Sequence, residues 1–349
     1  MSTEPDIFSV MTVHALDVST ATAERVALEH WGIAGTARVL TGERDRNFHF
    51  RAVDGREFVL KFANPVEDAA VVDMQIQALR HLAQVDPSFP VPRVIPMPDG
   101  SVETLVAHET GGIQRVRLLS WVPGTLLHSS RRSAAQRVAC GRGLARLEVA
   151  LARFAHPSTG HALIWDMQHI LRLRDLAPML GTAEAQDVFG GILDDFAARV
   201  APALPYLRRQ VLYNDMNGGN TLVDSANHDR LAGIIDFGDM VETAVAIDVG
   251  TGATSQLAPD LDEVTALGLF VGGYHAVYPL LPEELTLIPL LTAARIGMSL
   301  TLQSWHRRIQ PDNPHYADVT EDVLRRRLDN IAALRAPGVE TALRRACGL

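Results

Sequence analysis

The chain has little cysteine, no excess of basic residues and no long uninterrupted apolar run. Its two cysteines, Cys140 and Cys347, lie far apart and belong to no metal-ligand or redox spacing. A disulfide framework is therefore not expected, and a reducing compartment is the default for such a protein. The formal net charge of −9 argues against a nucleic-acid partner, which needs a basic surface to neutralise phosphates.

Two further absences concern membranes and export. The most apolar region, residues 264–302, is broken by prolines and by Glu283 and Glu284, so no apolar span of about 20 residues remains. Residues 1–10 lack the basic stretch followed by an apolar core that marks a secretory signal. We therefore expect a cytoplasmic protein, with neither membrane nor nucleic acid among its partners.

The composition is that of a globular protein large enough for two lobes, since 47 % of the 349 residues are apolar and 21 % are charged. In the first 120 residues, helices are predicted at 20–31 and 66–84. Alternating apolar runs predict five strands, at residues 37–40, 48–53, 57–62, 102–108 and 114–120. The Asp54-Gly55 turn joins the second and third strands, and residues 111–112 join the last two.

From residue 133 onward the pattern is mainly helical. Five helices are predicted from the apolar spacing, at residues 133–154, 165–180, 183–199, 258–278 and 283–309. One β insertion interrupts them, with short strands at residues 211–212, 221–223 and 231–236. A small antiparallel sheet followed by a larger helical part predicts an α+β, protein-kinase-like bilobal fold. Its expected parts are an N-lobe at residues 1–120, a linker at 121–125 and a C-lobe at 126–349.

The strongest functional pattern is the polar loop 213–220, followed after an apolar hairpin by the sequence Ile-Asp-Phe-Gly. Phosphoryl transfer requires an oriented hydroxyl group and metal ions held against the phosphates, with little covalent chemistry from the protein. Asp215, Asn220 and Asp236 have the order and spacing that supply one proton acceptor and two metal ligands. The simpler interpretation treats Asp215 and Asn217 as turn formers and Asp236 as a turn at a strand end. The joint occurrence of Asp215, Asn220 and Asp236 favours the kinase interpretation.

These segments resemble the aminoglycoside phosphotransferase and choline kinase superfamily, whose catalytic loop reads H-x-D-x-x-x-x-N before an I-D-[FW] strand. Within it the chain is most similar to hydroxylysine kinase-like proteins, through four shared stretches. They are residues 42–48 (GERDRNF), 117–119 with 123–124 (RLL, PG), 214–215 (ND) and 234–240 (IIDFGDM). The resemblance implies that Asp215 is the catalytic base and that Asn220 and Asp236 hold Mg²⁺. The loop histidine is Tyr213 here, and because that histidine mainly braces the loop, we expect the chemistry to survive the change.

Lys61 is a second candidate, because it stands in the otherwise apolar strand 58–62 (FVLKF). A lysine there costs desolvation unless it meets a negative partner, such as the α- and β-phosphates of a nucleotide. Exposure on an edge strand is the alternative. Kinase-like folds usually pair this lysine with a glutamate on the next helix, and that position is Gln75 here. Gln75 can still accept a hydrogen bond from Lys61, and Asp73 or Glu67 can substitute for the missing charge.

The rest of the nucleotide site is expected from position. The loop 41–47 lies where kinase folds cover the triphosphate; it is no G-x-G-x-x-G, but its amides with Arg44 or Arg46 can meet phosphate oxygens. An ordinary charged turn is the alternative. The base, adenine or guanine, is expected against the backbone of Ser120 and Val122.

The residues that would bind the phosphoryl acceptor are harder to identify from the sequence. Asp239 and Glu242 follow the catalytic segment, and carboxylates there would pair with a cationic amine in a partly dry cleft. Arg295, on an otherwise apolar helix, suits either a substrate carboxylate or a buried structural ion pair. Asp248 matches a position that the superfamily uses to brace the catalytic loop. Asp166 is a weaker candidate, and a core or surface role is preferred for it.

Three hypotheses follow. The first is a Mg²⁺-dependent kinase that transfers the γ-phosphoryl group of ATP or GTP to a small amino alcohol or hydroxy amino acid, with hydroxylysine favoured. Stretches around Asn313 and Tyr316 also resemble the hydroxylysine kinase-like proteins. The second is an aminoglycoside phosphotransferase, and the third is a catalytically silent kinase fold that serves as a binding module. A monomer or a homodimer is expected.

Overall fold

The computed structural model describes residues 7–8, 13, 16–107, 112–311 and 319–349 of the chain. Residue 111 of the predicted hairpin turn, together with Asn313 and Tyr316, lies outside the described residues. The chain divides into two compact units. Unit 1 comprises Met1–Val122 with His156–Ala162, and unit 2 comprises Pro123–Ala155 with Leu163–Leu349.

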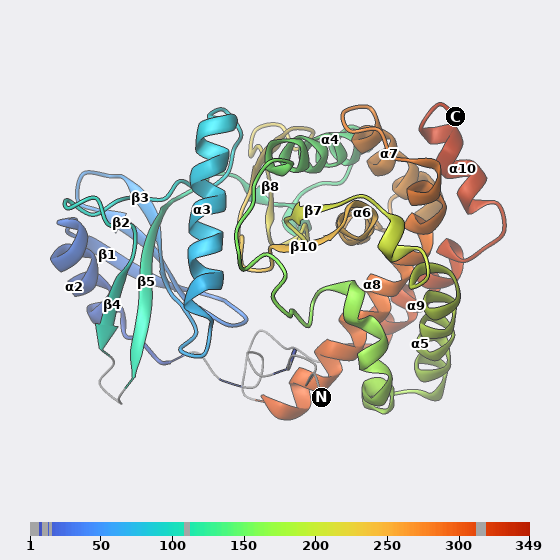
Figure 1. Cartoon of the computed structure of the whole chain (residues 1–349), viewed down its shortest axis with the longest axis horizontal. Helices are drawn as coiled ribbons and strands as arrows, with labels where there is room; N and C mark the ends of the chain where they lie inside the picture. The colour runs from blue at the N-terminus through green and yellow to red at the C-terminus, as the bar shows by residue number, and fades with distance from the viewer. Residues whose placement is uncertain (1–6, 9–12, 14–15, 108–111, 312–318) are drawn as a thin grey trace. The chain divides into compact units, whose positions relative to one another are not determined.

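Unit 1 is built on an antiparallel sheet with the strand order β1-β2-β3-β5-β4. The strands are β1 (Gly35–Leu40), β2 (Arg46–Ala52), β3 (Glu57–Phe62), β4 (Thr104–Ala107) and β5 (Ile113–Ser120). Side chains alternate across each strand, so the sheet has two distinct faces. Each face is covered by one helix (Figure 1).

Helix α2 (Thr20–Trp31) covers the first face, where its apolar residues pack against Phe48, Phe50, Leu60 and other strand residues. Helix α3 (Ala69–Val85) starts after its N-cap Asp68 and lies over the other face. Lys61 belongs to that second face, because its strand neighbours Leu60 and Phe62 both point into the α2 core.

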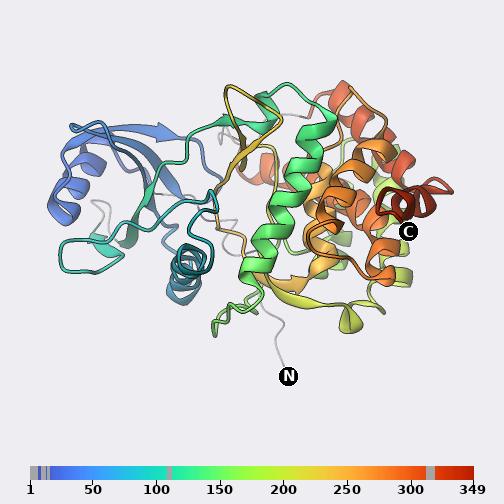
Figure 2. The same ribbon diagram turned by 90° about the horizontal axis from the view of Figure 1, so that it is seen from above.

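Unit 2 is mainly helical. Its α-helices are α4 (Ala134–Leu151), α5 (Ala183–Asp195), α6 (Val245–Thr254), α7 (Glu263–His275), α8 (Pro282–Ile309), α9 (Glu321–Leu334) and α10 (Val339–Ala346). The other helical segments are the 3₁₀ segments Leu127–Ser129, Met167–Met179 and Leu204–Tyr206 and the π segment Phe196–Val200. Helix α4 runs beside α7, green against orange in Figure 2, and α6 packs closely on α8. A Cβ added at Gly250 of α6 would lie 2.8 Å from the Cβ of Leu291 on α8.

Two small antiparallel groups of strands place the functional loops. Strand β7 (Arg209–Leu212) pairs with β10 (Val241–Ala244). Strand β8 (Thr221–Val223) pairs with both β6 (Thr125–Leu126) and β9 (Leu231–Ile234). The loop 213–220 therefore joins β7 to β8, and residues 235–240 join β9 to β10, so both loops begin and end at strands.

The predicted α+β architecture is confirmed, with a small antiparallel sheet region followed by a larger helical region. The predicted helix at 165–180 is a 3₁₀ run with Pro178 inside it. Helices α6, α9 and α10 and strands β6 and β10 were not predicted. Helix α6 has no apolar stripe to detect, because residues Val245 to Ala253 are all buried.

Helix α8 is the single described helix long and apolar enough to cross a membrane by length and composition. Its most apolar window is 89 % buried, which is typical of the core helix of a compact protein.

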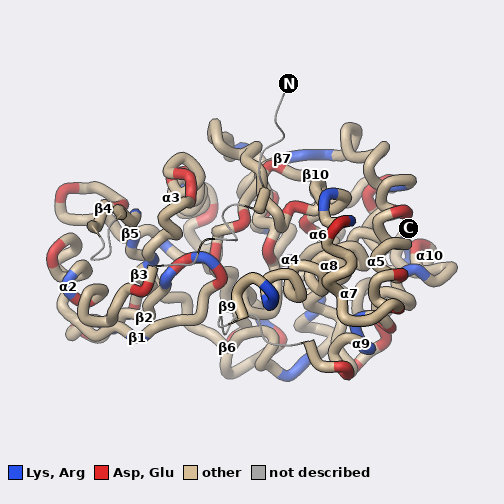
Figure 3. Tube along the Cα trace, turned by 90° about the horizontal axis from the view of Figure 1, so that it is seen from below, with Lys and Arg blue, Asp and Glu red and all other residues tan. Residues whose placement is uncertain are grey.

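In Figure 3 the acidic and basic positions are scattered along the trace of both units, and the basic ones do not form one continuous stripe.

A buried ion pair in unit 2 provides a stability test. Arg137 of α4 is fully buried, and its guanidinium donates to both carboxylate oxygens of Asp260, at 2.9 and 2.5 Å. Removing the carboxylate leaves a buried cation with carbonyl partners only. We expect Asp260→Ala to lower the free energy of unfolding by about 3 kcal/mol, the low end for a broken buried pair because Asp260 is partly exposed.

Asp194→Ala is the matched control, because it breaks the exposed pair with Arg174 and should cost less than about 1 kcal/mol. Urea denaturation followed by circular dichroism measures both losses. Equal losses in the two variants would contradict the importance given to burial.

Candidate active site

The loop that carries Asp215 is held by a buried carboxylate. Asp248, in the first turn of α6, is fully buried and accepts hydrogen bonds from the backbone N–H groups of Tyr213 and Asn214, at 3.1 and 3.0 Å. Burial raises the pKa of Asp248 to about 7, although both hydrogen bonds favour the charged form. The predicted bracing role of Asp248 is confirmed.

Backbone strain marks the same region. Among the described residues, Asn214 (φ 62°) and Asp236 (φ 59°) are the only non-glycine residues with positive φ. Such conformations cost energy and persist only where the surrounding contacts impose them, as at functional sites. They bend the chain beside Asp215 and at the start of the segment 235–240 that follows β9.

Tyr213 joins these two strained segments. Its hydroxyl donates to the backbone oxygen of Ile235, and its ring meets Phe237 edge-on at a centroid distance of 5.1 Å. Burial raises the pKa of the Tyr213 hydroxyl well above its usual range, so the group stays a neutral donor. The tyrosine at the superfamily's histidine position thus braces the loop.

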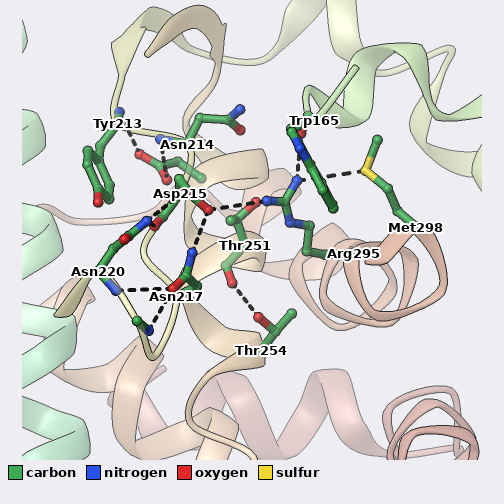
Figure 4. A network of polar contacts seen from close by, with 12 residues as sticks. Trp165, Tyr213, Asn214, Asp215, Asn217, Asn220, Thr251, Thr254, Arg295 and Met298 are labelled. Carbon is green, nitrogen blue, oxygen red and sulfur yellow. Dashed lines mark hydrogen bonds and ion pairs between the residues drawn. The ribbon is translucent and has the colours of Figure 1, made fainter. Parts of the chain in front are cut away.

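The carboxylate of Asp215 is oriented from three sides (Figure 4). Asn217 donates to its Oδ1 at 2.9 Å, and Asn220 donates to its Oδ2 at 2.5 Å. The Arg295 guanidinium of α8 lies 3.6 Å from Oδ1. Asp215 is therefore held in one orientation by groups that also restrict its loop.

Its electrostatic surroundings suit a proton acceptor. Burial raises the pKa of Asp215 well above its usual range, and the negative charge of Asp239 raises it further, while Arg295 opposes both effects. A carboxyl group whose pKa is shifted toward neutrality can take and release a proton more readily than a solvated aspartate.

The sequence analysis considered Asn217 only as a turn former and missed its contact with Asp215. The Asn217 Oδ1 accepts from the backbone N–H groups of Gly219 and Asn220, at 2.7 and 3.1 Å, while its Nδ2 donates to Asp215. One side chain therefore shapes the turn and orients Asp215. An asparagine two residues after an aspartate is a turn signal, and that signal alone does not reveal the second role.

The proposed metal ligands lie next to each other on the β8–β9 hairpin. Ile235 N–H donates to the Asn220 backbone oxygen at 2.9 Å, and Asp236 follows directly, exposed and accepting from Gly238 N–H at 3.3 Å. Because the Asn220 amide nitrogen is used by Asp215, its amide oxygen is the atom left for a cation. Oxygen donors of this kind fit Mg²⁺.

In the part of the chain that the structure describes, no group of three or more His, Cys, Asp or Glu side chains is placed to hold a metal. A Mg²⁺ ion at Asn220 and Asp236 would therefore take its remaining ligands from phosphates and water, as this ion commonly does.

On the acceptor side, two of the three predicted residues lie close to Asp215. Asp239 is buried, and its negative charge raises the pKa of Asp215. Arg295 is buried too; it donates to the Trp165 backbone oxygen at 2.6 Å and lies over the Trp165 ring at 4.8 Å. Glu242 differs, since its side chain is exposed on β10 between buried neighbours.

Asp166 has a structural role, as preferred. It is buried and caps the 3₁₀ segment Met167–Met179, accepting from Gln168 N–H at 3.0 Å and from the Thr243 hydroxyl at 3.1 Å.

In unit 1, Lys61 is buried and lies 3.4 Å from the carboxylate of Asp45. Gln75 of α3 accepts a hydrogen bond from Arg117 of β5 at 2.7 Å. Asp45 and Arg117 belong to segments that carry the family resemblance, but the sequence analysis gave neither a role. Only the strand register, which sets Arg117 opposite Lys61, brings them together.

The two arginines of loop 41–47 lie differently. Arg46 is paired with Phe62 across the strands, on the α2 face and thus opposite the face of Lys61, and it binds Asp17 at 3.1 Å. Arg44 is half-buried, and its backbone oxygen accepts from the Asn64 side chain at 3.3 Å. Arg46 therefore does not face a ligand on the Lys61 side of the sheet, and Arg44 is the candidate that remains.

Ser120 and Val122, the candidates for contact with the nucleotide base, lie at the end of the Met1–Val122 part of unit 1. The Ser120 N–H donates to the Arg93 backbone oxygen at 2.8 Å, and its hydroxyl accepts from Arg93 N–H at 2.8 Å. Its backbone oxygen is therefore the group suited to a base. Val122 is the last residue of this part of unit 1.

The chain was compared with known proteins. The model of the phosphotransferase enzyme family matches residues 36–285. Hydroxylysine kinase of Danio rerio is 27 % identical over 318 residues, covering 88 % of this chain and 89 % of the relative. The same enzyme of Mus musculus is 24 % identical, covering 80 % of each.

Two solved structures share the fold. A microcompartment-associated aminopropanol kinase has a TM-score of 0.69 at 18 % identity, covering 94 % of this chain and 99 % of that one. The amicoumacin kinase hAmiN, solved with AMP-PNP, Ca²⁺ and Ami, has a TM-score of 0.68 at 14 % identity, covering 90 % and 94 %. These similarities confirm the protein-kinase-like fold. Because the family model spans well over half of the sequence, the chain belongs to the phosphotransferase enzyme family and transfers a phosphoryl group to a hydroxyl group of a small molecule.

Proposed function

We propose that the enzyme transfers the γ-phosphoryl group of ATP or GTP to a small amino alcohol or hydroxy amino acid, with hydroxylysine as the favoured acceptor. The observation that carries the proposal is the orientation of Asp215 by Asn217, Asn220 and Arg295 on a strained, braced loop. The curated hydroxylysine kinases, similar over most of their length, support the choice of acceptor.

In this proposal Asp215 accepts the proton of the acceptor hydroxyl as the oxygen attacks the γ-phosphorus. The bond from that phosphorus to the β-phosphate oxygen breaks, and the nucleoside diphosphate leaves. The raised pKa of Asp215 suits its task, and the two asparagines keep its oxygens directed. Asn220 and Asp236 would hold Mg²⁺, which supplies neutralising charge to the phosphates when bound. The AMP-PNP and Ca²⁺ of the amicoumacin kinase structure support the use of a nucleotide with a divalent ion.

The other roles follow the two units. Residues 1–120 would form the N-lobe, in which Lys61 and Arg44 contact phosphates and the backbone of Ser120 and Val122 contacts the base. Residues 121–125 would be the linker. The C-lobe, 126–349, would hold the acceptor.

For the acceptor, Asp239 would attract the ammonium group, with Glu242 as an outer carboxylate. Arg295 would attract the substrate carboxylate, because its Nη2 lies 3.6 Å from Oδ1 of Asp215, the proposed base. A hydroxy amino acid carries both charges, which is why hydroxylysine is favoured over a simple amino alcohol.

The alternatives have less support. An aminoglycoside phosphotransferase is supported by fold similarity alone, as with a solved enzyme of that name from Alicyclobacillus acidocaldarius at 14 % identity and a TM-score of 0.59. Membership of an enzyme family argues against a silent binding module. We further propose a cytoplasmic protein, monomeric or homodimeric, that needs neither membrane nor nucleic acid.

Replacing the proposed base should separate catalysis from binding. We expect Asp215→Asn to lower kcat about 10²- to 10⁴-fold, because the variant cannot accept the proton, while the Kd for the Mg²⁺–nucleotide stays within about twofold. Steady-state kinetics and calorimetry measure the two quantities. Asp224→Asn is the control, since the Asp224 carboxylate also accepts two N–H groups, here from the backbone, but lies on the exposed β8–β9 turn. A nearly normal kcat in Asp215→Asn would remove the base role.

The metal assignment predicts a binding defect. Asp236→Ala should abolish the rise in melting temperature that ATP produces with Mg²⁺, because the carboxylate that anchors the ion is gone. Thermal shift assays with and without EDTA measure this, and Asp224→Ala should behave like the wild type. An unchanged Mg²⁺-dependent shift in Asp236→Ala means that the ion binds elsewhere.

The acceptor can be identified with a panel of compounds. We expect the highest kcat/KM with 5-hydroxylysine, a value about tenfold lower with 1-amino-2-propanol, which lacks the carboxylate for Arg295, and little product with kanamycin. Phosphorylated product is measured by mass spectrometry. If kanamycin proved the best substrate, the antibiotic kinase alternative would replace the proposed function.

A further inference from the structure

Two buried cations face each other on the sheet of unit 1. Lys61 of β3 is directly opposite Arg117 of β5, and their exposed fractions are 5 % and 4 %. Directly opposed residues of antiparallel strands point to the same face, where like charges repel. Burial makes the arrangement more costly unless an anion lies between them.

Asp45 provides that anion from the loop between β1 and β2. Its Oδ2 lies 3.4 Å from Lys61 Nζ and 3.8 Å from Arg117 Nη2, so one oxygen serves both cations. Its Oδ1 accepts from the Asn64 backbone N–H at 3.0 Å. The carboxylate is therefore fixed in direction as well as in place.

The loop is shaped to deliver this carboxylate. A Cβ at Gly42 would lie 2.7 Å from the Asp45 backbone oxygen and 2.8 Å from Asn47 Nδ2, so the tight turn requires glycine. The Asn64 side chain donates to the Arg44 backbone oxygen and holds the loop against the end of β3. These contacts hold the β1–β2 loop beside Lys61.

Helix α3 has a different tether. Arg117 Nη2 donates to Gln75 Oε1 at 2.7 Å, which links α3 to the sheet through a neutral side chain. Within the described residues, Arg117 Nη1 is buried and has no hydrogen-bond partner. Two buried cations therefore share one carboxylate oxygen, and Arg117 also binds a neutral amide.

We propose that Asp45 is the residue that positions Lys61 for the nucleotide phosphates, so that the acidic counter-charge lies in the β1–β2 loop and not on helix α3. The inference rests on the proposed function, in which Lys61 contacts the phosphates. Arg117 ties α3 to the sheet through Gln75, and its positive charge opposite Lys61 favours a phosphate group. The position of the loop and the orientation of Lys61 are then set together.

Asp45→Asn tests this role with little change in shape. We expect the KM and Kd for MgATP to rise about tenfold, because Lys61 loses its charged partner, while the acceptor KM stays within about twofold. Asp54→Asn is the matched control: like Asp45, Asp54 accepts a backbone N–H and pairs with a cation, in its case both from Arg56, but it lies on the exposed β2–β3 turn. Its nucleotide affinity should equal that of the wild type.

Rescue distinguishes positioning from a merely structural effect. Gln75→Glu places a carboxylate beside Arg117, and in the Asp45→Asn background it should restore most of the affinity for MgATP. Should Asp45→Asn not fold, as judged by circular dichroism, Asp45→Glu carries the test. It keeps the charge, moves it by one methylene, and should weaken MgATP binding about threefold.

The opposing outcomes are distinct. Tighter or unchanged MgATP binding by Asp45→Asn, or unchanged binding by Asp45→Glu where that variant carries the test, would overturn the inference and leave the proposed function standing. Absence of MgATP binding by the wild type would instead end the proposed function, and the inference with it. Loss of affinity without rescue by Gln75→Glu would reduce Asp45 to a structural support of its loop.

Discussion

The catalytic loop depends on one buried carboxylate, that of Asp248, which accepts two consecutive backbone N–H groups. A carboxylate can receive two such donors at once, whereas an amide or hydroxyl side chain offers fewer acceptor positions. This contact holds Asn214 in its positive-φ conformation, and the bend at Asn214 turns Asp215 toward Asn217 and Asn220. Asp248 lies in the first turn of helix α6, so the packing of α6 on α8 also sets the position of the loop. The same packing brings Arg295 of α8 beside Asp215.

Much of this arrangement could be predicted from sequence, because it depends on local order. The strand around Lys61, the loop before β8 and the segment after β9 are short motifs with fixed spacing. The structure has the first two between the expected elements and the third directly after the expected strand β9. The bracing by Asp248 came from family resemblance, since helix α6 shows no amphipathic period from which it could be found. Helices α9 and α10 are short, amphipathic and distant from any motif, and they were simply missed.

The contacts that sequence could not reveal join residues far apart in the chain. Arg117 meets Asp45 and Gln75 only because β5 lies beside β3 and α3 covers that face, and strand order is a property of the whole sheet. Arg46 shows the same limit from the other side. Its charge suggested a phosphate contact, but the two-residue period of β2 turns it to the α2 face, with Phe48.

The two sets of residues differ in charge, and this bears on what each can bind. Around Asp215, the carboxylates of Asp236 and Asp239 add negative charge, which Arg295 opposes. Like charges close to a buried carboxylate are costly unless a cation enters, and in the proposed function a divalent ion and the ammonium group of an acceptor would meet that need. Lys61 and Arg117 are buried cations that share one oxygen of Asp45, which suits an anionic ligand such as phosphate. The metal–triphosphate and the cationic acceptor of the proposed function would therefore bring to each set a ligand of the opposite charge.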